Sequence, residues 1–139
     1  MALLAEMIFL ASSAIVVELC VNAVRTKLTG ERTGWDLKGS VSIWMFPIYM
    51  IGLTYGFDAI YLVMKHISEY DAIRWISYPF WIWLVEYVIG TLTKNKLWDY
   101  SPLPYNIKGS VSLLHYPAWI IFGVMFEQLR YLYWCYAWI

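Results

Sequence analysis

The sequence predicts an all-α fold, an integral membrane bundle of four transmembrane helices built from two repeated helical hairpins. Three observations support this prediction: the composition, the spacing of long apolar segments and an internal repeat. Apolar residues make up 61% of the 139 residues, and charged residues only 14%. A soluble domain is about half apolar and about a quarter charged. This chain therefore has too little polar surface to cover a globule in water, and we expect a single transmembrane domain over residues 1–139.

Four apolar segments are long enough to cross the hydrocarbon core of a bilayer, which takes roughly 20 residues. They cover residues 3–24, 41–64, 73–92 and 111–133. We expect the first segment to be a retained helix, because it lacks the basic region and the small-residue cleavage site of a signal peptide. Prolines inside the later segments predict kinks, which neighbouring helices can accommodate. These are Pro47, Pro79 and Pro117.

The Lys and Arg residues of the polar connections predict the orientation in the membrane. The first and third connections hold most of them: Arg25, Lys27, Arg32, Lys38, Lys94, Lys96 and Lys108. The opposite side holds Lys65, Arg74 and Arg130. Positively charged loops stay in the cytoplasm. We therefore expect the long loops on the cytoplasmic side or its equivalent, and both termini on the opposite side.

An internal repeat relates the two halves of the chain. Residues 37–49 read LKGSVSIWMFPIY, and residues 107–119, seventy positions later, read IKGSVSLLHYPAW. Outside this segment, Val17-Glu18 matches Val85-Glu86, and Phe57-Asp58 matches Phe126-Glu127. We interpret the chain as two helix–loop–helix hairpins, at about residues 3–65 and 72–135. Because each copy has two spans, both insert in the same orientation, as in parallel-repeat membrane proteins.

Short motifs follow one another in a characteristic order along these segments. They are Glu18, the Gly-Ser start of the segment at 39–49, Trp83 with Glu86, the WDYS sequence at 98–101, and Glu127-Gln128. In this order the chain resembles the transmembrane-protein-229 family, which is also described as the putative ABC-transporter type IV family. The likeness spans nearly the whole chain, although Trp83 and Glu86 are one residue closer than in the W-x-x-x-E motif of the family. The resemblance implies a multi-span membrane protein.

Acidic residues within the apolar segments are the best candidates for lipid or ion binding. They are Glu18, Asp58, Glu86 and Glu127. A charge at such depth is costly, so it usually faces the bundle interior and has a partner. One hypothesis is a path for protons or cations, or a site for a polar lipid headgroup.

The alternative hypothesis is that these acids only hold the bundle together. Glu18 and Glu86 would then pair with Lys38 and Lys108, or with Ser and Tyr hydroxyl groups opposite. Glu127 would pair with Arg130, one helical turn further on.

The two KGSVS sequences carry a second pair of candidates, Lys38 and Lys108. Each sequence is expected to start a helix, where its serines would cap free backbone amides and its small side chains would allow close packing. Alternatively, the helix start and the lysine would bind an anion such as a lipid phosphate.

The sequence contains none of the motifs that would indicate a catalyst. It has no GxSxG, no HExxH and no Cys/His cluster, and residues 34–40 lack the Lys that a P-loop places before its Ser. Cys20 and Cys135 are far apart in apolar segments and do not form a metal motif. The formal net charge is zero. We therefore expect no enzyme activity, no cofactor, no metal and no nucleic-acid partner.

The last apolar segment is rich in aromatic residues that would contact another protein. The candidates are Trp119, Phe122, Tyr131, Trp134 and Trp138. In the middle of a bilayer, lipid tails leave the polar atoms of Trp and Tyr without hydrogen-bond partners, whereas a protein contact offers such partners. We expect a small accessory or structural subunit that packs, among membrane lipids, with other membrane subunits or with itself. The alternative is a transporter-like protein that moves protons, cations or an anionic lipid past the intramembrane carboxylates.

Overall fold

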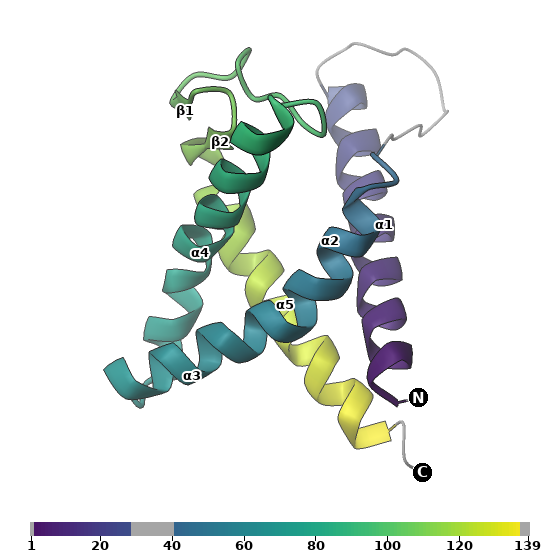
Figure 1. The fold of residues 1–139 in the computed structure, drawn as a ribbon, viewed down its shortest axis with the longest axis vertical. Helices are drawn as coiled ribbons and strands as arrows, with labels where there is room; N and C mark the ends of the chain where they lie inside the picture. Colours follow the sequence, from purple (N-terminus) through teal and green to yellow (C-terminus); the bar gives the residue numbers. More distant parts are fainter. Residues whose placement is uncertain (1, 29–40, 137–139) are drawn as a thin grey trace. The chain divides into compact units, whose positions relative to one another are not determined.

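The computed structural model describes residues 2–28 and 41–136, and in these residues the chain is all-α apart from one short pair of strands (Figure 1). The chain divides into two compact units, Met1–Thr54 and Tyr55–Ile139. Each unit is described by itself.

The first unit contains two helices that pack against each other, α1 (Ala2–Leu28) and α2 (Met45–Ile51). One stripe of α1 is buried, and each of its members lies three or four residues from another member, as a helix face requires. They are Glu6, Leu10, Ala11 and Ala14. The buried carboxyl group of Glu6 lies within the stripe and was not among the predicted site residues.

The segment Met45–Ile67 is helical throughout, but it changes its winding in the middle. A π-helix, η1 (Gly52–Gly56), follows α2 and precedes α3 (Phe57–Ile67). The spacing between the matched repeat residues is seventy at Pro47 and Pro117, but sixty-nine at Phe57 and Phe126. Under the predicted repeat, the first copy has one residue more than the second between these points. A π turn closes with i→i+5 bonds and so holds about one residue more than an α turn, which accommodates the extra residue without a break in the helix.

The second unit is built on the pairing of α4 (Asp71–Thr93) with α5 (Tyr116–Tyr136), and α3 also packs on α4. The α4–α5 contact is close because Gly123 of α5 faces the ring of Tyr78. Tyr78 of α4 and Phe126 of α5 are each only 1% exposed.

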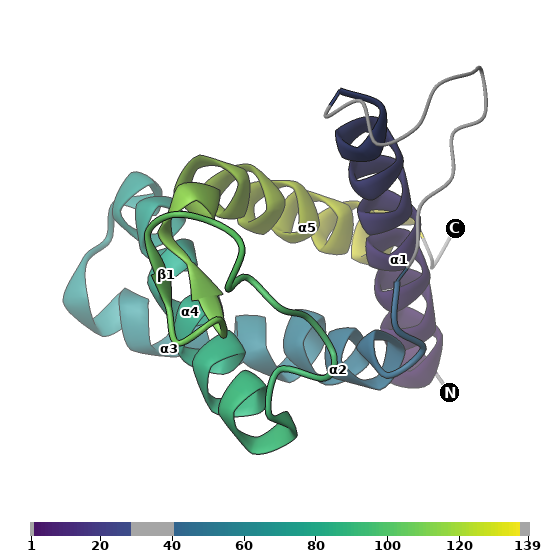
Figure 2. The ribbon, with the colours of Figure 1, turned by 90° about the horizontal axis from the view of Figure 1, so that it is seen from above.

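The connection between α4 and α5 folds back on itself. Strand β1 (Asn106–Ile107) pairs antiparallel with β2 (Val111–Ser112), and a 3₁₀ turn, η2 (Leu113–His115), leads into α5. We call residues 94–112 the loop cap. Figure 2 shows it from above, and β2 packs on α4.

The predicted start of the fourth segment was wrong, because Val111 and Ser112 form a strand and α5 begins only at Tyr116. The second segment likewise begins later than predicted, at Met45. Pro47 and Pro117 lie in the first turns of their helices, where a missing backbone N–H is tolerated. These two prolines therefore mark helix starts, and Pro79 alone lies inside a helix, α4.

Two helical segments of the described residues are long and apolar enough to cross a membrane, Ala2–Val24 and Met45–Ile67. The sequence predicted four. Helices α4 and α5 are also long, with 23 and 21 residues, but both are rich in Trp and Tyr. The polar tips of these side chains lower the hydropathy of a segment, although they suit a membrane interface. The four-span bundle therefore stays a prediction.

Candidate functional site

Each of the four acidic residues predicted as a site bonds to a different structural element in the described residues. Glu18 bonds to Tyr49, Asp58 to Arg130, Glu86 to Tyr100, and Glu127 to Arg74 and Tyr78. Glu18 belongs to the first unit, and Asp58, Glu86 and Glu127 belong to the second. We describe their contacts in turn.

In the first unit, Glu18 joins α1 to α2. The Tyr49 hydroxyl donates a hydrogen bond of 2.7 Å to Glu18 Oε2. The expectation that a tyrosine hydroxyl would serve as its partner agrees with this contact. Lys38, the other expected partner, lies outside the described residues.

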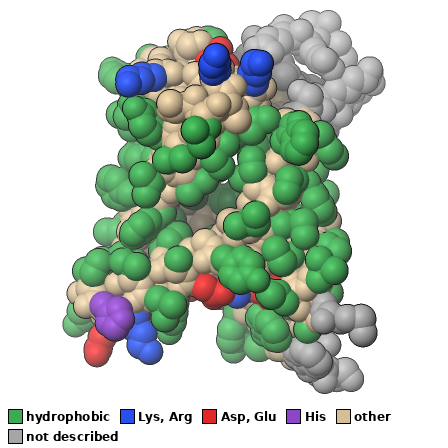
Figure 3. All heavy atoms as spheres, in the orientation of Figure 1, with side chains coloured by type: hydrophobic (Ala, Val, Ile, Leu, Met, Phe, Trp, Pro, Cys, Tyr) green, Lys and Arg blue, Asp and Glu red, His purple; other side chains and the backbone are tan. Residues whose placement is uncertain are grey.

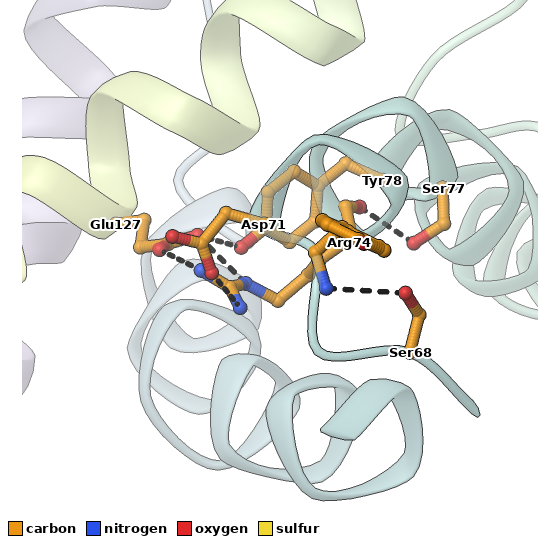
Figure 4. A network of polar contacts seen from close by, with 7 residues as sticks. Ser68, Asp71, Arg74, Ser77, Tyr78 and Glu127 are labelled. Atoms are coloured by element: carbon orange, nitrogen blue, oxygen red, sulfur yellow. Dashed lines mark hydrogen bonds and ion pairs between the residues drawn. The ribbon is translucent and has the colours of Figure 1, made fainter. Parts of the chain in front are cut away.

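In the second unit, Glu127 of α5 is the centre of a polar network with α4 (Figure 4). Arg74 Nη2 donates to Glu127 Oε1 at 2.6 Å, and Arg74 Nε donates to Oε2 at 3.3 Å, so the guanidinium holds the carboxylate with two bonds. The Tyr78 hydroxyl also donates to Glu127. Arg74 pairs in addition with Asp71 at 2.9 Å and lies over the ring of Tyr61, 5.2 Å from its centroid.

Arg130 has a different partner from the one predicted. It forms a two-pronged ion pair with Asp58, at 2.7 and 3.1 Å, and so joins α5 to α3. The expected pair of Glu127 with Arg130 was therefore wrong. Two ion pairs between helices are formed instead. Arg74 of α4 pairs with Glu127 of α5, and Asp58 of α3 pairs with Arg130 of α5.

Glu86 joins α4 to the loop cap. Its side chain is buried, and Oε1 accepts a hydrogen bond of 2.8 Å from the Tyr100 hydroxyl. The Tyr100 ring in turn packs edge-on against His115, with 5.1 Å between the ring centroids. The tyrosine of the WDYS motif thus connects the buried carboxylate of α4 with η2, the turn that leads into α5.

The WDYS and KGSVS motifs meet in the loop cap. Trp98 Nε1 donates to the Ser110 carbonyl at 2.9 Å, and the Tyr100 amide donates to the Gly109 carbonyl at 2.8 Å. Asn95 adds two bonds, since its Nδ2 donates to the Lys108 carbonyl and its Oδ1 accepts from Ser110 Oγ at 2.7 Å. The two motifs are therefore explained as the two sides of one hydrogen-bonded turn.

The KGSVS sequence does not start a helix in its second copy. Gly109 has φ of +69°, and a Cβ there would lie 3.0 Å from Asn95 Nδ2 and from Asp99 Oδ1, so the turn requires glycine. Ser110 bonds to Asn95 and does not cap α5, which begins six residues later. Lys108 Nζ lies near Tyr87, 3.3 Å from its hydroxyl. In this copy, the anion site expected at a helix start and the pair of Lys108 with Glu86 were therefore wrong, whereas Lys38 of the first copy lies outside the described residues.

Asp99 also has a structural part in the loop cap. Its Oδ1 accepts a hydrogen bond of 2.9 Å from the Ser101 amide. This backbone hydrogen bond, followed by one with the Ser101 side chain, lowers the pKa of Asp99. The carboxylate form thus stabilises the turn that begins the WDYS motif.

The aromatic residues predicted to contact a partner fall into two groups. Trp119 and Phe122 form a ladder of ring contacts along α5 that runs from His115 to Phe126. Tyr131 and Trp134, near the end of α5, are 65% and 42% exposed. Trp138 lies outside the described residues.

The partners of the carboxylates were the part of the site that sequence reasoning missed. They are Tyr49, Arg74, Tyr78 and Tyr100. A usable signal was the spacing of Arg74 and Tyr78, which are four residues apart and therefore share one face of α4. Tyr100 had no such signal, because its place depends on the fold of the loop cap.

Replacing Tyr100 with Phe is expected to lower the stability of the protein by about 1–3 kcal/mol, because a hydrogen bond to a buried carboxylate is lost while the ring is kept. The midpoint of thermal unfolding in mild detergent, followed by Trp fluorescence, measures the effect. Tyr105→Phe is the matched control, since Tyr105 is 73% exposed and its substitution should leave the midpoint nearly unchanged. Equal midpoints for the two variants would contradict the role assigned to Tyr100.

Comparison with known families adds one finding to this geometry. Residues 43–137 match the sequence model of the family described as putative ABC-transporter type IV. The match includes α3, α4 and α5, and with them both ion pairs and the loop cap. No solved structure matches the chain.

Proposed function

The chain belongs to the putative ABC-transporter type IV family, and on that premise we propose that it is a non-enzymatic polytopic membrane protein, an accessory or structural subunit of a larger membrane protein complex. The observation that carries this proposal is the use of the carboxylates. All four join two elements of the chain, as described above, so their contacts serve to hold helices and loop together. A carboxylate that holds two elements together is poorly suited to transport, because a transported ion would have to displace this contact each time it binds.

Four transmembrane spans are part of the proposal. At about 1.5 Å per residue, the 23 residues of α4 and the 21 of α5 reach about the 30 Å thickness of the hydrocarbon core. The proposal includes two parallel repeats, which the similar starts of α2 and α5 after matched Val-Ser pairs support. It also includes the closer likeness to the transmembrane-protein-229 family and long loops on the cytoplasmic side.

The proposed contact with a partner subunit lies near the end of α5. Tyr131, Trp134 and Tyr136 are each more than 40% exposed there. Tyr and Trp give large rigid contact area with a polar atom to pair, and they are enriched at protein interfaces. The ring ladder of Trp119 and Phe122 would stiffen the helix that presents them.

The combined variant Tyr131→Gln/Trp134→Gln is expected to lose a subunit that co-purifies in fixed proportion with the wild-type chain in mild detergent. Native mass spectrometry of the purified complex gives the stoichiometry. Tyr105→Gln is the control, because Tyr105 is also an exposed aromatic residue but belongs to the loop cap. A wild-type chain that is a bare monomer, or a complex that both variants keep, would contradict the proposed contact.

A transporter-like protein is the second candidate, and the description of the family favours it. In this case the chain would move protons, cations or an anionic lipid past Glu18 and Glu86. Flux into liposomes that contain the purified chain separates the two candidates. Flux that a well-folded Glu86→Gln variant loses would overturn the accessory role.

A further inference from the structure

Three lysines gather at the end of the second unit that carries the loop cap: Lys94, Lys96 and Lys108. Figure 3 shows Lys and Arg side chains grouped over this end. All three are exposed, and none of them forms an ion pair with a carboxylate in residues 2–28 and 41–136. We call these three side chains the basic surface.

The backbone that carries the basic surface is held in place. Lys94 and Lys108 both have left-handed φ values, 54° and 53°, which L residues rarely adopt without support. Asn95 supplies this support: its amide donates to the Gly90 carbonyl at 2.8 Å, and its side chain donates to the Lys108 carbonyl at 2.9 Å. The backbone at Lys94 and Lys108 is therefore held by Asn95, and the Lys96 amide donates to the Thr93 carbonyl at 3.2 Å.

The helix dipole explains only part of this arrangement. Lys94 and Lys96 follow the last turn of α4, where cations are favourable. Lys108 comes from the turn between β1 and β2, and its amine lies 5.8 Å from the centre of the Tyr87 ring. Against these lysines, residues 94–112 contain one acid, Asp99, which is bonded to the Ser101 amide. The surface thus keeps a positive charge that the described residues do not neutralise.

Apolar side chains stand exposed beside the charges. Leu92, Tyr105 and Ile107 are 78%, 73% and 44% exposed. Amines next to exposed apolar groups fit the boundary between headgroups and acyl chains, where lysine stems lie along apolar surface and their charges face phosphates.

We propose that the basic surface binds the headgroups of anionic phospholipids and anchors the loop cap to one leaflet of the membrane. This inference rests on the proposed membrane function. The occupant follows from charge: an anionic leaflet attracts juxtamembrane lysines, each by about 1 kcal/mol, or about fivefold in affinity. The fixed backbone lets the three amines act together on neighbouring headgroups without a large ordering cost.

The test compares the full chain in mild detergent with added dioleoyl phosphatidylglycerol or, at the same mole fraction, dioleoyl phosphatidylcholine. Phosphatidylglycerol is expected to raise the unfolding midpoint more than phosphatidylcholine. The variant Lys94→Gln/Lys96→Gln/Lys108→Gln should lose this difference, and its affinity for phosphatidylglycerol should fall about fivefold for each lysine removed. Lys65→Gln is the matched control, since Lys65 is an exposed lysine at the end of α3.

Three results would overturn the inference. They are an equal response of the wild type to the two lipids, a triple variant that keeps the response, and a response to millimolar inorganic phosphate that equals the response to the lipid. The last would assign the surface to a free anion. If the triple variant does not fold, Lys96→Gln alone, followed by bound-lipid counts in native mass spectrometry, makes the same comparison. All these variants keep Tyr131 and Trp134, so a negative result leaves the partner contact to be judged by its own experiment.

Discussion

Replacing Gly123 with alanine is expected to destabilise the α4–α5 pair by about 3 kcal/mol, at the upper end of the range for overpacked cores. A Cβ at this position would lie 2.3 Å from Tyr78 Cδ2 and 2.5 Å from Cγ. The ring cannot move aside easily, because it is 1% exposed, its hydroxyl bonds to Glu127, and it packs against Phe57 at 5.1 Å. Unfolding by sodium dodecyl sulfate in mixed micelles measures the loss.

Gly52→Ala provides the control for this substitution. Gly52 also lies in a helical segment, but a Cβ there would meet no atom within 4 Å. Alanine at Gly52 should therefore have little effect or stabilise slightly, since it restricts the unfolded chain. If both alanine variants unfold at the same concentration of sodium dodecyl sulfate, the close contact of Gly123 with Tyr78 does not decide the packing of α4 on α5.

Replacing Arg74 with methionine is expected to lower the free energy of unfolding by up to about 3 kcal/mol, the lower end of the penalty for removing one partner of a buried ion pair, because this pair is only partly buried. Arg74 is 13% exposed and gives Glu127 two hydrogen bonds, and the variant leaves this carboxylate with the Tyr78 hydroxyl. Glu127→Gln should cost less. It keeps the shape of the side chain, and Arg74 retains Asp71, which lies 2.9 Å away. Unfolding midpoints in the same micelles give the order of the two variants.

The double variant Arg74→Met/Glu127→Leu distinguishes pairing from mere packing. If the two charges stabilise each other, the double variant should lose clearly less than the sum of the two single variants. Asp58→Asn is the control at an exposed pair. The Asp58 side chain is 55% exposed, and we expect a loss below about 1 kcal/mol. Additive losses at Arg74 and Glu127 would contradict the pairing.

The sequence was a good guide to where helices lie, because long apolar segments have few other solutions. It was a poor guide to how they begin. Pro47 and Pro117 were interpreted as kinks within spans, but both lie in the first turn of a helix, where proline is also common. The apolar Val111 looked like part of a helix, but it lies in strand β2 and pairs with Ile107 of β1. Such starts depend on contacts with Asn95 and Trp98 that no local pattern contains.

The candidate site, like the fold, could be predicted from the sequence only in part. That buried acids would have partners follows from the energetics of charge in an apolar medium, and the hydroxyl partner of Glu18 agrees with that expectation. Which residue serves as the partner depends on helix heights and rotations. Arg130 was assigned to the acid nearest in sequence, Glu127, whereas it reaches across to Asp58, seventy-two residues away.

The distances along the chain between bonded partners suggest an order of folding for the second unit. In the loop cap, Asn95 and Lys108 are thirteen residues apart, and Glu86 and Tyr100 fourteen. Arg74 and Glu127 are separated by fifty-three residues, and Asp58 and Arg130 by seventy-two. Closing a short loop loses less entropy than closing a long one. We therefore expect the loop cap to form first, and α4 and α5 to pair progressively from the cap towards the two ion pairs. Local unfolding should follow the opposite order. The end of the α4–α5 hairpin at Arg74 should open first, and its backbone amides should exchange hydrogen faster than those of the loop cap.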